Sequence, residues 1–172
     1  MRNIYLVGMV GVGKSTIGKL LSEKMEWGFI DMDEMVETIY NLTIEEIFNS
    51  YGETAFHDME NKILLEVSQG NQQIIACSEG MLKNTKNLSL LKVTGLLFWL
   101  EAPVETLVNR IKDSKYLFLL TDDHTKILQE WLTKRKDLYQ QSDVIVSTAK
   151  YSPEEVAAAI RKIAFDSGKY QF

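Results

Sequence analysis

Short, almost wholly apolar runs alternate along this chain with longer stretches in which apolar residues recur every three or four positions. The runs 4–7, 73–77 and 95–100 are the clearest, and such runs are typical of parallel strands that are covered on both faces. The stretches between them have the spacing of amphipathic helices. We therefore predict an α/β protein of the three-layer α/β/α kind, with a five-stranded parallel sheet between two layers of helices.

The last expected helix has a clear start signal. Ser152 and Pro153, followed by two glutamates, place a cap, a first-turn proline and negative charge where a helix N-terminus favours them. The expected strands cover 4–7, 28–30, 73–77, 95–100 and 143–147, and the expected helices cover 15–25, 44–51, 53–69, 104–111, 127–138 and the segment from 153 onward.

The length and continuity of the chain favour one domain. Its 172 residues are within the usual range for a single core, and no Pro-rich or Gly/Ser-rich linker divides them. We predict one domain, 1–172, with an acceptor-binding region at about 33–60. The polar break at about 111–124 is too short to separate domains and is interpreted as a lid.

Composition argues against several classes of partner. Nineteen Lys and Arg stand against 24 Asp and Glu, for a net charge of −5, so the chain lacks the basic surface that nucleic-acid binding needs. The apolar runs are far shorter than the ~20 residues that cross a bilayer, so no membrane is expected. A single cysteine, Cys77, and the lack of a signal-peptide core predict a cytoplasmic protein. We expect a monomer.

The strongest motif follows the first predicted strand. The segment 8–15 reads G-M-V-G-V-G-K-S and satisfies G-x-x-x-x-G-K-[ST] between a strand and a helix, which is the context of a P-loop. Lys14 is expected to reach the β and γ phosphates of ATP, and Ser15 to bind Mg²⁺. Thr16 is expected to cap the helix and to contact the α phosphate. The candidate nucleotide-binding residues here are Gly11, Val12, Gly13, Lys14, Ser15 and Thr16.

Two carboxylates follow the second predicted strand. Asp31 and Asp33 stand where open α/β sheets place their ligands. One carboxylate would hold the hydrated metal, and the other would hydrogen-bond the acceptor hydroxyl as a general base or an orienting group. The alternative is that Asp33 only caps the helix that follows.

These motifs, with others further along, resemble those of the shikimate kinase family over nearly the whole chain. The matching segments keep the family's order. They are the P-loop 8–16, Asp31-x-Asp33, the stretch 44–48, Gly52-Glu53-x-x-Phe56 with Glu60, Arg135-x-x-Leu138-Tyr139, Ser142-Asp143 and the helix start 152–155.

The resemblance implies a P-loop kinase fold and an ATP- and Mg²⁺-dependent transfer of a phosphoryl group to a small-molecule hydroxyl, that of shikimate, in aromatic amino acid biosynthesis. It implies that Asp31 serves Mg²⁺ and that Asp33 serves the acceptor, acting in catalysis together with Lys14. Arg135 would bind the acceptor's carboxylate, and Arg110 would lie against the adenine.

The chain departs from the family pattern on the acceptor side and in the lid. His57 replaces an arginine, and Ser78-Glu79-Gly80 replaces a glycine triplet. The lid pattern R-P-L-L is matched only at Leu119-Leu120, because Leu117 and Phe118 take the Arg and Pro places, and Lys115 is a partial substitute.

We expect His57 and Glu79 to form a polar pair in the acceptor cleft, suited to a neutral or cationic hydroxyl compound. The candidate substrate-binding residues are Asp33, His57, Glu79, Gly80 and Arg135. The alternatives are a surface histidine, a solvated loop acid that swings away, and, for Arg135, a solvated basic helix face with its lysine neighbours. Three functions therefore remain open: a shikimate kinase, a kinase for another hydroxyl metabolite, and a catalytically weak nucleotide-binding regulatory protein.

Overall fold

Five parallel strands form the sheet at the centre of the molecule, in the order β2-β3-β1-β4-β5. The computed structural model describes residues 2–112 and 123–166. The strands confirm the predicted ones to within a residue or two at their ends. They are β1 (Asn3–Val7), β2 (Gly28–Asp31), β3 (Gln73–Ala76), β4 (Gly95–Glu101) and β5 (Val144–Ser147).

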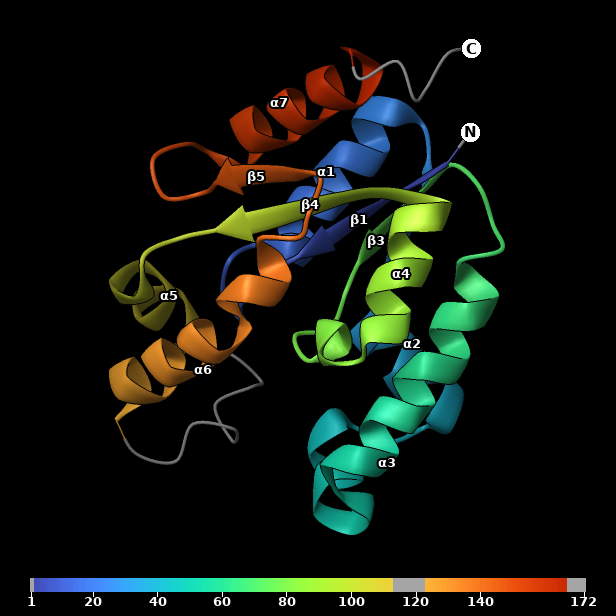
Figure 1. Cartoon of the computed structure of the whole chain (residues 1–172), viewed down its shortest axis with the longest axis vertical. Helices are drawn as coiled ribbons and strands as arrows, with labels where there is room; N and C mark the ends of the chain where they lie inside the picture. The colour runs from blue at the N-terminus through green and yellow to red at the C-terminus, as the bar shows by residue number, and fades with distance from the viewer. Residues whose placement is uncertain (1, 113–122, 167–172) are drawn as a thin grey trace.

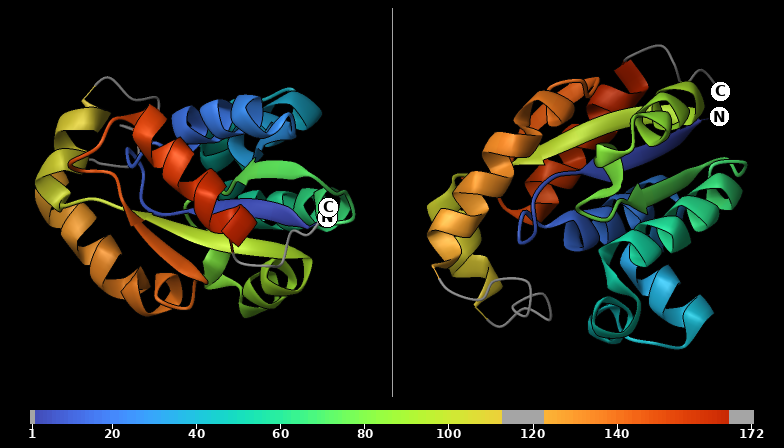
Figure 2. Two further views of the ribbon diagram at one scale, coloured as in Figure 1. Left: turned by 90° about the horizontal axis from the view of Figure 1, so that it is seen from above. Right: turned by 60° about the horizontal axis from the view of Figure 1, so that its bottom comes forward.

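Helices cover both faces of this sheet, which confirms the three-layer arrangement (Figure 1). Figure 2 shows α1 and α7 side by side on one face, with α3, α4 and α6 on the other, as right-handed crossovers require for this strand order. The helices are α1 (Lys14–Met25), α2 (Met32–Tyr40), α3 (Ile44–Val67), α4 (Thr85–Thr94), α5 (Val104–Ile111), α6 (His124–Tyr139) and α7 (Pro153–Asp166), with a short 3₁₀ helix η1 (Met81–Lys83).

The central strands β1 and β4 are apolar except for Asn3 at the start of β1 and Glu101 at the end of β4, because neither face meets water. In β1 every residue is buried, and in β4 only the last, Glu101, is not. Their register places Leu6 beside Phe98 on one side and beside Ala76 of β3 on the other. The edge strand β5 is only partly covered, although three of its four residues are apolar.

Two helix starts differ in an instructive way. At α7 the expected cap is confirmed, because the Glu155 amide donates to the Ser152 hydroxyl at 3.2 Å and the Ser152 amide donates to the Glu155 carboxylate at 2.8 Å. At α1 the expectation was wrong. The helix begins at Lys14 with Gly13 as its N-cap, so Thr16 lies within the first turn and does not cap it.

The predicted lid is described only at its ends. Ile111 closes α5 and His124 opens α6, and the segment 113–122, with Lys115 and Leu117 to Leu120, lies outside the described residues. Within the described ranges no helix combines the length and the apolar character needed to cross a bilayer.

Helix α3 is broken where the sequence predicted two helices. Gly52 has φ 79° and ψ 172°, so the chain turns sharply between the two helical parts. Only glycine adopts this backbone conformation readily. The turn sets the direction of the second part, which places Glu53 and His57 in the wall of the cleft described below and buries Glu60.

We therefore expect Gly52→Ala to lower the free energy of unfolding by about 1–3 kcal/mol, the usual cost of such backbone strain. A Cβ atom at this position would meet nothing within 4 Å, so the loss would come from the backbone and not from a clash. Urea unfolding measures it, with Ser50→Ala on the exposed surface of the same helix as the control. Equal stability of the two variants would contradict this origin of the bend.

Candidate active site

The P-loop leaves the buried end of β1 and wraps toward the N-terminus of α1. Three of its glycines, Gly8, Gly11 and Gly13, have positive φ, so the loop takes a path that residues with a Cβ atom rarely follow. Because Gly13 offers no capping side chain, the first N–H groups of α1 are available to an anion at the positive end of the helix. This is the geometry that binds the phosphates of a nucleotide.

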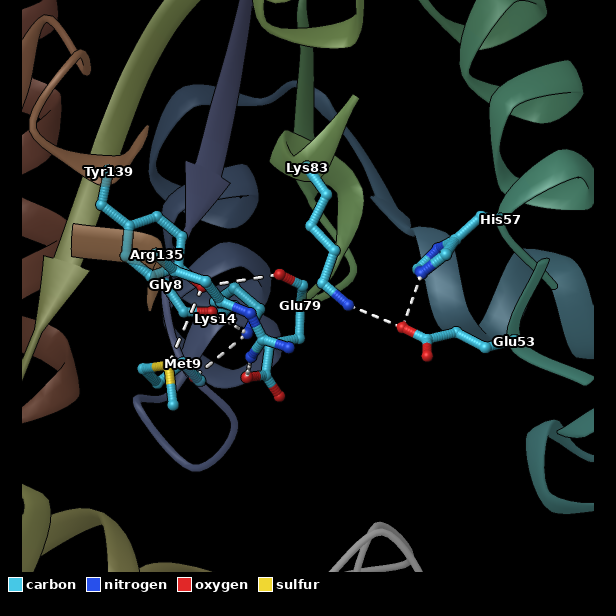
Figure 3. Close-up of polar contacts among 9 residues, drawn as sticks. All are labelled: Gly8, Met9, Lys14, Glu53, His57, Glu79, Lys83, Arg135 and Tyr139. Atoms are coloured by element: carbon cyan, nitrogen blue, oxygen red, sulfur yellow. Dashed lines mark hydrogen bonds and ion pairs between the residues drawn. The ribbon is translucent and has the colours of Figure 1, made fainter. Parts of the chain in front are cut away.

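Lys14 folds back over this loop. Its Nζ donates hydrogen bonds to the carbonyl oxygens of Gly8 at 2.8 Å and Met9 at 3.2 Å (Figure 3). Two carbonyl oxygens of the P-loop therefore hold the ammonium group. Phosphate oxygens of a ligand could replace these two carbonyls as its hydrogen-bond acceptors.

Asp31 has two structural roles at once. One carboxylate oxygen accepts hydrogen bonds from the amides of Asp33 at 3.0 Å and Glu34 at 3.3 Å, which makes Asp31 the N-cap of α2. The other accepts from the Ser15 hydroxyl at 2.5 Å. The alternative that Asp33 caps this helix is thus wrong, because Asp31 is the cap.

Ser15 and Asp31 bring a hydroxyl and a carboxylate oxygen together beside the P-loop. Mg²⁺ in phosphotransferases is bound through one or two protein oxygens, with phosphates and waters completing its octahedron, and this pair fits that requirement. Over the described part of the chain, no group of three or more His, Cys, Asp or Glu side chains could form a metal cage.

Arg110 reaches from α5 to the loop between β5 and α7. Its guanidinium donates to the Thr148 carbonyl at 2.8 Å, to the Thr148 hydroxyl at 3.1 Å and to the Val12 carbonyl at 3.4 Å. These bonds hold the guanidinium beside the P-loop, in a position that suits an adenine ring; that contact stays a prediction.

Glu79 and Arg135 form an ion pair across the cleft (Figure 3). Their side chains are only 15% and 11% exposed, so neither is a solvated surface group, and both of those alternatives are wrong. The Arg135 guanidinium also lies over the Trp131 ring, 4.7 Å from its centre, and such stacking fixes the plane of an arginine.

His57 belongs to a second polar cluster. Its Nδ1 lies 2.6 Å from Glu60 and its Nε2 lies 3.2 Å from Glu53, whose carboxylate also accepts from Lys83 at 2.6 Å. The ring packs against Gly80, since a Cβ atom there would lie 2.5 Å from the ring. The expected pair of His57 with Glu79 is therefore wrong: both face one cleft, but His57 bonds to acids of its own helix.

Burial and pairing shift the pKa values of His57, Glu60 and Glu79. The hydrogen bond that Glu60 accepts from His57 raises the pKa of His57 above its ordinary value, although burial opposes this shift. Burial raises the pKa of Glu60, which is 1% exposed, against the opposing hydrogen bond from His57. The pair therefore holds a proton to higher pH than two separate side chains would. Burial also raises the pKa of Glu79, while Arg135 lowers it.

The candidate nucleotide-, metal- and substrate-binding residues named from the sequence all line one cleft of about 650 Å³. The structure thus brings them together, while the ligand atom that each contacts stays a prediction. Its walls combine the P-loop residues 11–16, Asp31, Asp33, His57, Glu79, Gly80, Arg110 and Arg135.

The sequence assigned no role to three side chains that shape this cleft, although Glu53 belongs to one of the matching motifs. Trp131 lies four residues before Arg135, and Glu53 lies four residues before His57, so helical spacing alone could have indicated both contacts. Lys83 lies 30 residues from its partner Glu53, and no local signal links them.

The raised pKa of His57 makes the stability of the fold depend on pH. The folded state binds this proton more tightly than the unfolded state does, so the stabilisation is fully present below about pH 6.5, the ordinary pKa of histidine. It is lost as the pH rises through the folded-state pKa. We expect His57→Gln to cost more unfolding free energy at pH 5.5 than at pH 9, measured by urea unfolding across this range.

His124→Gln is the matched control, because it replaces the other of the two histidines without touching Glu53, Glu60 or Lys83. If both variants differ from the parent protein by the same amount at every pH, the proton is not held by the His57–Glu60 pair.

Comparison with known proteins agrees with this geometry. A model of the family "Shikimate kinase" matches residues 10–164. A shikimate kinase of Thermodesulfovibrio yellowstonii is 34% identical over 163 residues, which cover 94% of each chain. One from Gloeobacter violaceus is 37% identical over 165 residues, covering 94% of this chain and 92% of that one.

The solved structures give the same result. The structure of a shikimate kinase from Acinetobacter baumannii in complex with shikimate superposes with a TM-score of 0.92 at 29% identity, and the match covers 99% of this chain and 96% of that one. The family match includes the P-loop from Val10 onward, both aspartates and Arg135. This chain belongs to the shikimate kinase family.

Proposed function

We propose that this protein transfers the γ-phosphoryl group of ATP to the 3-hydroxyl group of shikimate. The observation that carries the proposal is that the P-loop and the acceptor residues line the same cleft in a chain of the shikimate kinase family. Both ends of the cleft come from one chain, so a monomer is sufficient for the reaction.

The nucleotide end supplies positive charge and metal ligands. The N–H groups at the start of α1 bind the phosphates, and Lys14 exchanges its carbonyl partners for β- and γ-phosphate oxygens. Ser15 and Asp31 would hold Mg²⁺, which would offset the charge that develops on the phosphates. Arg110 lies against the adenine.

The acceptor end orients the hydroxyl that attacks. Asp33 is the second residue of α2, directly after Asp31 and Met32, and it hydrogen-bonds the acceptor hydroxyl. As the new bond forms between this oxygen and the γ phosphorus, the bond from that phosphorus to ADP breaks, and Asp33 receives or directs the hydroxyl proton. Arg135 binds the acceptor's carboxylate.

One observation favours a second candidate, a kinase for a hydroxyl compound that lacks a carboxylate. Arg135 already has the Glu79 carboxylate as its partner, and an acceptor without negative charge would leave that ion pair intact. A regulatory protein that binds nucleotide with little turnover is the third candidate, which rests on the lid pattern alone.

A coupled assay of ADP release separates the three candidates. We expect shikimate-dependent ADP release that needs Mg²⁺. Turnover only with another hydroxyl compound would favour the second candidate, and tight ATP binding without turnover would favour the third.

Lys14→Ala tests the nucleotide end. Removing one charged donor from developing negative charge typically costs about 10²- to 10³-fold in rate, so we expect kcat in the coupled assay to fall by that factor. Lys62→Ala, an exposed lysine on α3 outside the cleft, is the matched control. A Lys14 variant with the control's kcat would exclude the proposed role.

Two replacements of Asp31 separate its roles in folding and in metal binding. Asn caps a helix about as well as Asp, whereas Ala loses about 0.5–2 kcal/mol. We expect Asp31→Asn to keep its stability in urea but to need a much higher Mg²⁺ concentration for half-maximal rate, and Asp31→Ala to lose both. An unchanged Mg²⁺ requirement in either variant would remove Asp31 from the metal site.

A further inference from the structure

The Glu79–Arg135 pair joins two distant parts of the chain at the acceptor end of the cleft. Glu79 follows β3, at the carboxyl ends of the strands, where the P-loop and Asp31 also lie. Arg135 is on α6. Their carboxylate and guanidinium meet directly (Figure 3), and both side chains are mostly shielded from water. A carboxylate bound to an arginine inside a cleft uses guanidinium donors that would otherwise be available to the carboxylate of a ligand.

Both partners are held in position by further contacts. The Trp131 ring lies beneath the Arg135 guanidinium, and the buried Tyr139 hydroxyl donates to the backbone carbonyl of Glu79 at 3.4 Å. The same hydroxyl is 3.9 Å from the Met9 sulfur, which ties this corner to the P-loop. These contacts fix the positions of both side chains, so the ion pair is a stable part of the cleft wall and not a chance contact between two mobile surface side chains.

The acceptor end differs from the nucleotide end in how its cations are paired. Lys14 and Arg110 donate to backbone carbonyls and a hydroxyl. At the acceptor end, the three described side chains that can carry positive charge each meet a carboxylate of the chain itself. These three are His57, Lys83 and Arg135. An incoming carboxylate must compete with an internal one, whereas among the described residues no carboxylate forms an ion pair with Lys14 or Arg110.

We propose that Glu79 is a specificity-determining residue that acts as an internal competitor for Arg135, weakening the binding of acceptors that carry a carboxylate but not of uncharged ones. This inference rests on the proposed function, because it concerns the acceptor site of the same cleft. A hydrogen bond between charged groups is worth about 10- to 100-fold in affinity. Glu79 removes most of that gain from a carboxylate acceptor.

Shikimate and its methyl ester test this competition, because they share their hydroxyl groups and differ in charge. Calorimetry with Mg²⁺ and a non-hydrolysable ATP analogue gives the affinity of each for the parent protein and for Glu79→Gln. We expect the variant to bind shikimate about 10- to 100-fold more tightly and to bind the ester with unchanged affinity. Equal changes for both compounds, or no change for shikimate, would overturn the proposal.

Two further measurements exclude a merely structural effect. The affinity for the ATP analogue and the midpoint of urea unfolding should match those of Glu23→Gln, a control at an exposed position of α1 outside the cleft. If Glu79→Gln is unstable, Glu79→Gly serves as the second variant, with the same expected preference for shikimate over its ester.

Turnover is measured separately, so that the two proposals can fail independently. A shift in the binding preference without ADP release would support the role of Glu79 and contradict the proposed function. ADP release with shikimate and no shift in preference would do the reverse.

Discussion

The pairing of β3 between β1 and β2 is the constraint on which the rest of the cleft depends. It places the ends of three strands side by side, so that the P-loop after β1, Asp31 at the end of β2 and Glu79 after β3 share one edge of the sheet. The hydrogen bond from Ser15, at the start of α1, to Asp31 links the P-loop to the end of β2. Because parallel strands all point the same way, nucleotide and acceptor groups far apart in the sequence face one space.

Most of the fold could be predicted from the sequence, for a physical reason. Strands covered on both faces are almost entirely apolar, so β1 and β4 could be recognised from the sequence alone. Gly52 correctly predicted the break in α3. The start of α1 was less legible, because its cap is the backbone conformation of Gly13 and not a side chain. A threonine near a helix start, such as Thr16, looks like a cap whether or not it is one.

For the candidate site too, the sequence predicted the residues better than it predicted their contacts. Local motifs indicated the P-loop and the two aspartates, and family order added Arg135. What the sequence could not provide was the choice of partners, since Glu79 reaches an arginine 56 positions away and His57 turns to acids on its own helix. Position in a sequence shows which residues line a cleft more readily than which of them bond, because bonding depends on side-chain directions set by distant packing.

The carbonyl contacts of Lys14 bear on the energetics of nucleotide capture. The ammonium group of Lys14 is already hydrogen-bonded to the carbonyl oxygens of Gly8 and Met9. The side chain would therefore lose little further conformational entropy if phosphate oxygens replaced those carbonyls. Preorganisation of this kind strengthens binding by lowering the ordering cost and not by adding contacts. The side chain of Lys14 is therefore already ordered at the P-loop before any phosphate binds there.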